Sequence, residues 1–168
     1  ASLAVAGASF QAMFVNPLVS PGILGVLSGA SFGAALGMIM GWSWFFINLS
    51  TFIFGLIAVL FALLISFIYS SAKNMIILVL GGIISSSLFS ALLSIVKYAA
   101  DPYDALPAIT YWLMGSLAFS TPNIVWNLSI PLVLGMLILI FLSKYLNALS
   151  LGDEEAKALG VDTKKIKI

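Results

Sequence analysis

The longest uninterrupted apolar run of the sequence is FFINLSTFIFGLIAVLFALLISFIY, residues 45–69. Its polar side chains are few and uncharged. A helix of this length rises by roughly 37 Å at about 1.5 Å per residue, more than the roughly 30 Å of a bilayer's hydrocarbon core. The stretch therefore predicts a transmembrane helix that crosses the bilayer with some tilt.

The composition of the whole chain agrees with this prediction. Of 168 residues, 62% are hydrophobic and 8% are charged, and the mean hydropathy is +1.18. Ordinary soluble domains contain about 25% charged residues. No charged residue occurs before Lys73. The composition excludes a soluble domain, because such a domain needs charge over its whole surface, and it indicates that a lipid bilayer surrounds most of the chain.

The residue types that are missing exclude several functions. The sequence has no cysteine and no histidine, so it lacks the usual ligands of haem, zinc and iron–sulfur centres. The net charge is +1 without any arginine, so no basic stripe exists for nucleic acid. No glycine-rich phosphate loop is present, and no ionisable residue lies deep in a predicted span. We expect no catalytic residue, no metal site and no bound cofactor, and hence no enzyme.

Prolines and polar loops divide the chain into helices. We expect an all-α membrane protein, a polytopic bundle whose transmembrane region is residues 1–147. The predicted spans are residues 1–15, 23–41, 45–69, 75–96 and 124–143. Residues 105–119 are apolar but short, which predicts an interfacial or re-entrant helix. A cytoplasmic segment and the start of another helix are expected at residues 148–168.

Both ends of the sequence suggest truncation. A helix over residues 1–15 would rise only about 22 Å, so we expect a clipped first helix, and the sequence stops at Ile168 without a turn. The distribution of lysines leaves two orientations open. If residues 105–119 do not cross, Lys97 stands alone on the outer side; if they do, Lys73 stands alone. The shortness of that helix favours the first, with Asp101 and Asp104 outside.

One predicted span carries a glycine ladder with a period of four residues. The ladder consists of Gly25, Gly29, Gly33, Gly37 and Gly41. Helices in lipid associate by close backbone approach, which small residues permit. The ladder therefore predicts a tightly packed core helix; the alternative is a surface on which helices slide during transport.

A second stripe of small residues lies in the predicted span 75–96. It consists of Gly82, Ser86, Ser90 and Ser94, with Ser85 and Ser87 beside it. Hydroxyls on one helix face can line a wet pathway with weak polar groups. Equally, serine can bond to its own helix carbonyls or to a neighbouring helix. The sequence leaves both interpretations open.

The polar tail has the pattern of a short helix. Three acidic residues, Asp153, Glu154 and Glu155, begin it, Lys157 lies near its end, and Gly160 follows. This order suits the helix dipole and a glycine C-terminal cap. Two short helices beside a membrane could present a knob to a cytosolic partner; the alternative is a solvated linker.

Several motifs resemble those of one known family. They are Gly7-Ala8-Ser9-Phe10-Gln11-Ala12, Asn16-Pro17-Leu18, Pro21-Gly22-Ile23-Leu24-Gly25, Ser28-Gly29-Ala30, Tyr111-Trp112-Leu113-Met114-Gly115-Ser116, residues 149–156 and Leu159-Gly160-Val161. In this order they resemble the FecCD family, the permease subunits of ATP-binding cassette (ABC) importers for iron–siderophores, haem and vitamin B12. The resemblance covers essentially the whole chain.

The resemblance implies an architecture and partners. Family permeases have about ten transmembrane helices and work in pairs, so this chain is similar to about half a subunit. The implied partners are an ABC ATPase that carries ATP and Mg²⁺, an extracytoplasmic substrate-binding protein, a second permease copy and the lipid of the cytoplasmic (inner) membrane. By this resemblance the ATPase-coupling residues are Gly152, Asp153, Glu154, Glu155, Ala156, Leu159 and Gly160.

The resemblance also implies a transport pathway. Ser70 and Ser71 become candidates for the cytoplasmic constriction, and the serine-rich helix becomes a wall of the pathway. Relatives carry siderophores, haem, cobalamin or molybdate, so the substrate stays open. The alternative function, from a different class, is a passive channel or a structural membrane subunit without ATPase coupling.

Overall fold

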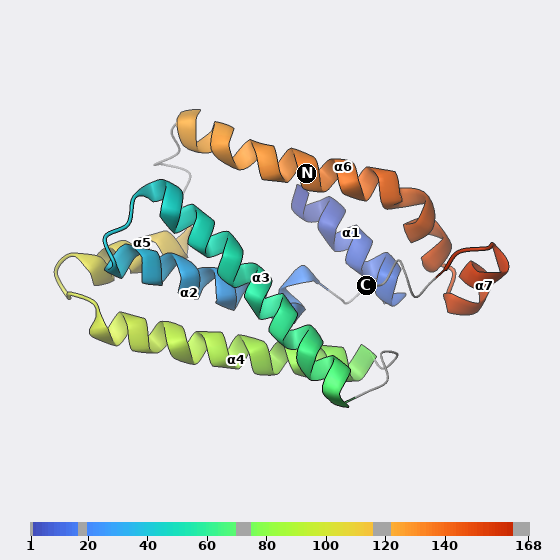
Figure 1. Cartoon of the computed structure of the whole chain (residues 1–168), viewed down its shortest axis with the longest axis horizontal. Coiled ribbons are helices and arrows are strands. Elements are labelled where there is room, and N and C mark those ends of the chain that lie inside the picture. Colours follow the sequence, from blue (N-terminus) through green and yellow to red (C-terminus); the bar gives the residue numbers. More distant parts are fainter. Residues whose placement is uncertain (1, 17–19, 70–74, 116–121, 163–168) are drawn as a thin grey trace. The chain divides into compact units, whose positions relative to one another are not determined.

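The computed structural model describes residues 2–16, 20–69, 75–115 and 122–162, and these are helices joined by turns, without strands (Figure 1). The chain divides into two compact units. One comprises Gly22–Ala118, and the other combines Ala1–Pro21 with Phe119–Ile168. The predicted all-α membrane fold is confirmed.

The unit Gly22–Ala118 is built from helices α2 (Val26–Ile39), α3 (Trp44–Tyr69), α4 (Met75–Ala99) and α5 (Ala105–Met114). A short 3-10 turn, η1 (Pro21–Leu24), precedes α2. One aromatic side chain from each of the three longer helices meets in the interior. The Phe32 and Phe54 ring centroids lie 5.0 Å apart, edge to face, and Phe89 lies 5.9 Å from Phe32. These contacts hold α2, α3 and α4 together.

Helix α5 packs against the ends of α2 and α4. Its Ile109 is buried with Ala35, Val96 and Ala100. The helix ends at Met114 because Gly115 takes a positive φ of 73°, so it is shorter than the predicted 105–119. At 10 residues it rises only about 15 Å, which agrees with the prediction that it does not cross the bilayer.

The other unit contains α1 (Ser2–Phe14), α6 (Pro122–Leu149) and α7 (Asp153–Ala158), with α1 packed along α6. Helix α6 continues past the predicted end at residue 143, because Leu146 and Leu149 are buried beyond Lys144. The predicted boundary between residues 147 and 148 therefore falls inside α6. Pro131 lies within this helix without ending it.

Three of the described helices are long and apolar enough to cross a membrane: Trp44–Tyr69, Ile76–Ala99 and Leu128–Leu149. The helix in the predicted span 23–41 is shorter than the sequence predicts, since α2 begins at Val26 and ends at Ile39. Gly25 adopts a left-handed conformation with φ 80°, and Gly41 does so with φ 66°. The helix between them, α2, has 14 residues, so it rises only about 21 Å.

Candidate coupling segment and transport pathway

Two residues of the glycine ladder hold α2 directly against α3. A β-carbon at Gly29 would lie 2.5 Å from Cβ of Ala58 and 2.5 Å from the Phe54 carbonyl oxygen. A β-carbon at Gly33 would lie 2.6 Å from the carbonyl oxygen of Ser50, whose hydroxyl donates a 2.9 Å hydrogen bond to the Gly33 carbonyl. No side chain fits at either position, so the backbones approach as closely as they can.

The other ladder glycines have different surroundings. A β-carbon at Gly37 would lie 3.1 Å from Ile47 at the start of α3, and Gly25 precedes the helix and approaches Ser85 and Ser86 of α4. Gly41 lies in the turn after α2, where a β-carbon would meet nothing within 4 Å. The expectation of one continuous face from Gly25 to Gly41 is therefore wrong at its two ends.

The serine stripe of α4 is also divided by its packing. Gly82 is buried against the backbone of Ile23 and Leu24, so the prediction that it belongs to a wet wall is wrong. Ser86 is half-buried, whereas Ser90 and Ser94 are exposed. Within the predicted stripe, the side chains of Ser90 and Ser94 are exposed, as the wall of a pathway requires.

The hydroxyls beside and within this stripe form hydrogen bonds both within their own helix and to a neighbouring helix. Ser87 and Ser94 donate to carbonyls of their own helix, those of Ile83 and Ser90. Ser90 bonds across to the Ser28 hydroxyl of α2 at 3.4 Å. Ser28 was not part of the predicted stripe, because the sequence does not indicate which residues of α2 face α4.

Ser85 is the fully buried serine of α4, and it bonds to α3. Its hydroxyl donates a 2.8 Å hydrogen bond to the carbonyl oxygen of Ala58. We expect Ser85→Ala to lower the free energy of unfolding in detergent by about 1 kcal/mol, the usual size of an interhelical hydrogen bond in a membrane protein. The matched control is Ser87→Ala, which removes an exposed hydroxyl bonded only to its own helix. Equal losses in both variants would contradict a role for the Ser85 bond in joining α3 and α4.

Two predicted residues cannot be placed. Ser70 and Ser71, the candidates for the cytoplasmic constriction, lie outside the described residues, as does Lys73. The turn that carries Asp101 and Asp104 is described. Asp101 has a local structural role there, since its Oδ1 accepts hydrogen bonds from the backbone N–H groups of Tyr103 and Asp104 at 2.8 and 3.1 Å.

The tail forms the short helix that its sequence predicts, α7. The predicted glycine cap is confirmed: Gly160 has φ 81°, its N–H donates to the Lys157 carbonyl at 2.9 Å, and the Val161 N–H donates to the Ala156 carbonyl at 3.0 Å. This pair of bonds is a Schellman motif. Gly152 precedes the helix with φ 112°, a conformation that favours glycine.

The side chains of α7 fall into an inner and an outer set. Ala156 is completely buried against Ala148 and Leu149 of α6, so the prediction that it contacts an ATPase directly is wrong. Leu159 is 63% exposed and Leu151 is 61% exposed. Glu154 and Lys157 form an exposed ion pair at 3.2 Å, which contributes little stability. We call Leu151, Glu154, Glu155, Lys157 and Leu159 the outer face of the tail.

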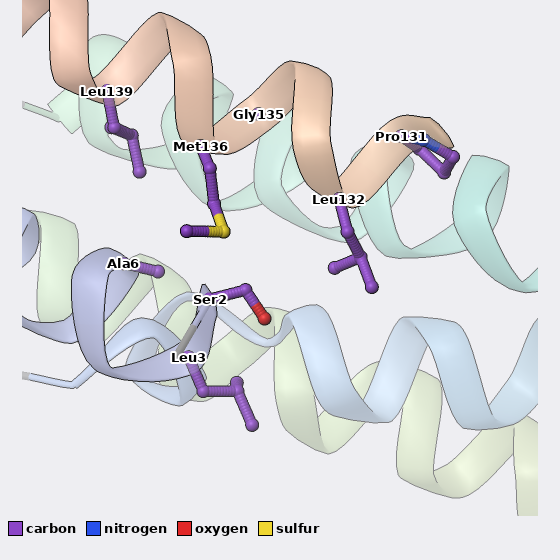
Figure 2. A pocket seen from close by; sticks show the side chains of 8 residues that line it. All are labelled: Ser2, Leu3, Ala6, Pro131, Leu132, Gly135, Met136 and Leu139. Carbon is purple, nitrogen blue, oxygen red and sulfur yellow. The ribbon is translucent and has the colours of Figure 1, made fainter. Parts of the chain in front are cut away.

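An open, apolar pocket of about 240 Å³ lies between α1 and α6 (Figure 2). Figure 2 shows Leu132 and Met136 of α6 pointing towards α1, opposite Ser2 and Ala6. The small residues Ala6 and Gly135 help to leave this space. Its lining has no charged side chain, and nowhere in the part of the chain that the structure describes do three or more aspartates or glutamates form a group that could hold a metal ion.

Helices with largely apolar, exposed surfaces, three of them long enough to span a bilayer, define a multi-pass helical membrane protein. The model of the FecCD transport family matches residues 1–168. The chain therefore belongs to the FecCD transport family, as its motifs indicate.

Individual relatives agree with this family. The chain is 43% identical over 161 residues to the molybdate import system permease protein MolB of Haemophilus influenzae, covering 96% of this chain and 48% of MolB. It is 32% identical to the iron(3+)-hydroxamate import system permease protein FhuG of Bacillus subtilis, covering 98% of this chain and 51% of FhuG.

A solved structure of an inward-facing metal-chelate type ABC transporter superposes with a TM-score of 0.88 at 42% identity, covering 99% of this chain and 52% of that chain. The chain thus spans about half the length of the relatives it matches.

Proposed function

We propose that this chain is the part of an ATP-driven importer permease that couples the membrane region to an ABC ATPase. The observation that carries the proposal is the tail: a capped helix, α7, fixed to the end of a membrane-length helix, with Leu151 and Leu159 exposed to solvent. Exposed leucines that are surrounded by charged side chains are typical of a protein–protein contact. Membership of the FecCD family supports the ATPase as the partner.

The proposed substrate is molybdate or a metal chelate, handed over by an external binding protein. The named import systems of the relatives handle molybdate, iron(3+)-hydroxamate and vitamin B12. The exposed hydroxyls of Ser90 and Ser94 support a wall of weak, uncharged polar groups, whose oxygens can accept hydrogen bonds while their protons are donated within the protein. Such a wall lets a cargo leave as readily as it enters.

The proposed arrangement is a pair of permeases in the cytoplasmic membrane, with α7 on the cytoplasmic side. The lysines support this orientation, since Lys144 and Lys157 both follow the last predicted span and lysine is enriched on the cytoplasmic side of membrane proteins. ATP and Mg²⁺ would be bound by the ATPase subunit. The permease contribution is then mechanical, because it transmits movement to the membrane helices.

The test is substitution of Leu159 in the assembled transporter. We expect Leu159→Asp to reduce both ATPase co-purification and transport at least tenfold, because a charge replaces an apolar contact and a tenfold loss corresponds to about 1.4 kcal/mol of binding. Leu159→Met, which keeps an apolar side chain of similar volume, is the control and should behave like the parent.

Two outcomes would contradict the proposal in different ways. A Leu159→Asp variant that binds its ATPase and transports at the parental rate would show that the outer face of the tail is not the coupling surface. A parental protein that carries its substrate without any ATPase would favour a passive channel instead.

A further inference from the structure

The helix of the tail is anchored by one small apolar cluster, which we call the tail anchor. It consists of Ala148, Leu149 and Ala156, with Met13 and Val161 packed against them. Leu149 and Ala156 have no exposed surface. The tail anchor thus joins the end of α1 to two segments far from it in the sequence, the end of α6 and the neighbouring helix α7.

Backbone hydrogen bonds make the connection between α6 and α7 equally tight. The Ser150 N–H donates to Leu146, that of Leu151 to Ala148, and that of Gly152 to Leu149, at 3.0 to 3.2 Å. The Ala156 N–H then donates to the Gly152 carbonyl at 3.0 Å. The segment between the two helices is therefore a hydrogen-bonded turn that connects α6 directly to α7.

A helix of six residues is too short to be stable by itself, so the orientation of α7 depends on what it buries. It buries Ala156 in the tail anchor together with Ala148 and Leu149 of α6, and Met13 of α1 packs against the same cluster. Close-packed side chains pass on a displacement instead of absorbing it. A partner that displaces Leu159 would therefore displace the end of α1 as well as the end of α6.

We infer that Ala156 is a positioning residue that makes α7 and the C-terminal ends of α6 and α1 one rigid unit. A movement of α7 then reaches α6 through the covalent chain, and it also reaches α1 through the packing of Met13. This inference rests on the proposed function of the outer face of the tail. It assigns to α1 a role in coupling that its position in the sequence, far from the tail, does not indicate.

A reversible cross-link across the tail anchor tests the inference in the assembled transporter. The sequence has no cysteine, so in the double variant Met13→Cys, Val161→Cys no other thiol of this chain can react. The two introduced thiols are joined by a short bis-methanethiosulfonate reagent. If the two segments move together, the joined protein should transport within about twofold of its reduced form. A loss of tenfold or more that a reductant reverses would show that α1 and the tail move apart, and would overturn the inference.

The second measurement is the amount of substrate transported per ATP hydrolysed. Ala156→Leu overfills the tail anchor, and we expect it to lower this ratio by at least threefold while Leu159 still holds the ATPase. Ala156→Ser, close in volume, should restore the ratio. A purely structural defect would reduce the amount of transporter and leave the ratio unchanged, which would also overturn the inference. Failure of the proposed function differs from both outcomes, because the parental protein would then bind no ATPase.

Discussion

Replacing Gly29 by leucine is expected to prevent the unit Gly22–Ala118 from forming its native packing. Even a β-carbon would lie 2.5 Å from a backbone carbonyl oxygen of α3, and backbone cannot move aside as a flexible side chain can. We expect the free energy of unfolding in detergent to fall by about 3 kcal/mol or more. The measurements are the yield of monodisperse protein by size-exclusion chromatography and a denaturant titration.

The control for this substitution is Gly7→Leu. Gly7 is also a helical glycine, but a β-carbon there would meet nothing within 4 Å. We expect this variant to insert and purify like the parent. If Gly29→Leu purifies as well as Gly7→Leu, with an unchanged free energy of unfolding, the close contact between α2 and α3 does not hold the unit together.

Replacing Ala156 by aspartate is expected to abolish transport, because it places a carboxylate in the tail anchor. Ala156 has no exposed surface, and the side chains of the tail anchor and those packed against it are all uncharged. An unpaired buried charge costs about 3 to 5 kcal/mol, far more than a helix of six residues can supply. We expect α7 to detach from α6, and both ATPase co-purification and transport to be lost.

The matched control is Ala158→Asp, which puts the same charge in the same helix at an exposed position. It should retain membrane insertion and ATPase binding, and its proteolytic pattern should match the parent. The tail of Ala156→Asp should instead be cleaved rapidly by added protease. Equal protection of the two variants would show that the tail anchor does not hold α7.

The sequence alone determined the fold class and most of the helices. The absence of charge before Lys73 requires lipid as the solvent, and residues 45–69 form one helix as predicted. The sequence also predicted features that depend only on neighbouring residues, such as the glycine that ends a helix. Gly160 ends α7 because a left-handed residue is needed there, and that requirement does not depend on the rest of the fold.

The sequence also indicated that α2 is packed through small residues, but it could not indicate which of them make the contact. Gly29 and Gly33 touch α3, whereas Gly25 and Gly41 take left-handed conformations at the two ends of the helix. A period of four residues continues through a helix end without any change in the pattern. Only the backbone conformation shows where the helix stops.

Tertiary structure alone decided which side chains are buried and which are available to a partner. In α4 the buried hydroxyl is that of Ser85, next to the predicted stripe, and in the tail Ala156 points inward while Leu159 is exposed. The physical reason is that lipid and protein interior are both apolar, so a membrane helix need not place polar residues on its outer face. Without that contrast, hydrophobic periodicity does not mark the buried face, and only the packing of the helices against one another determines it.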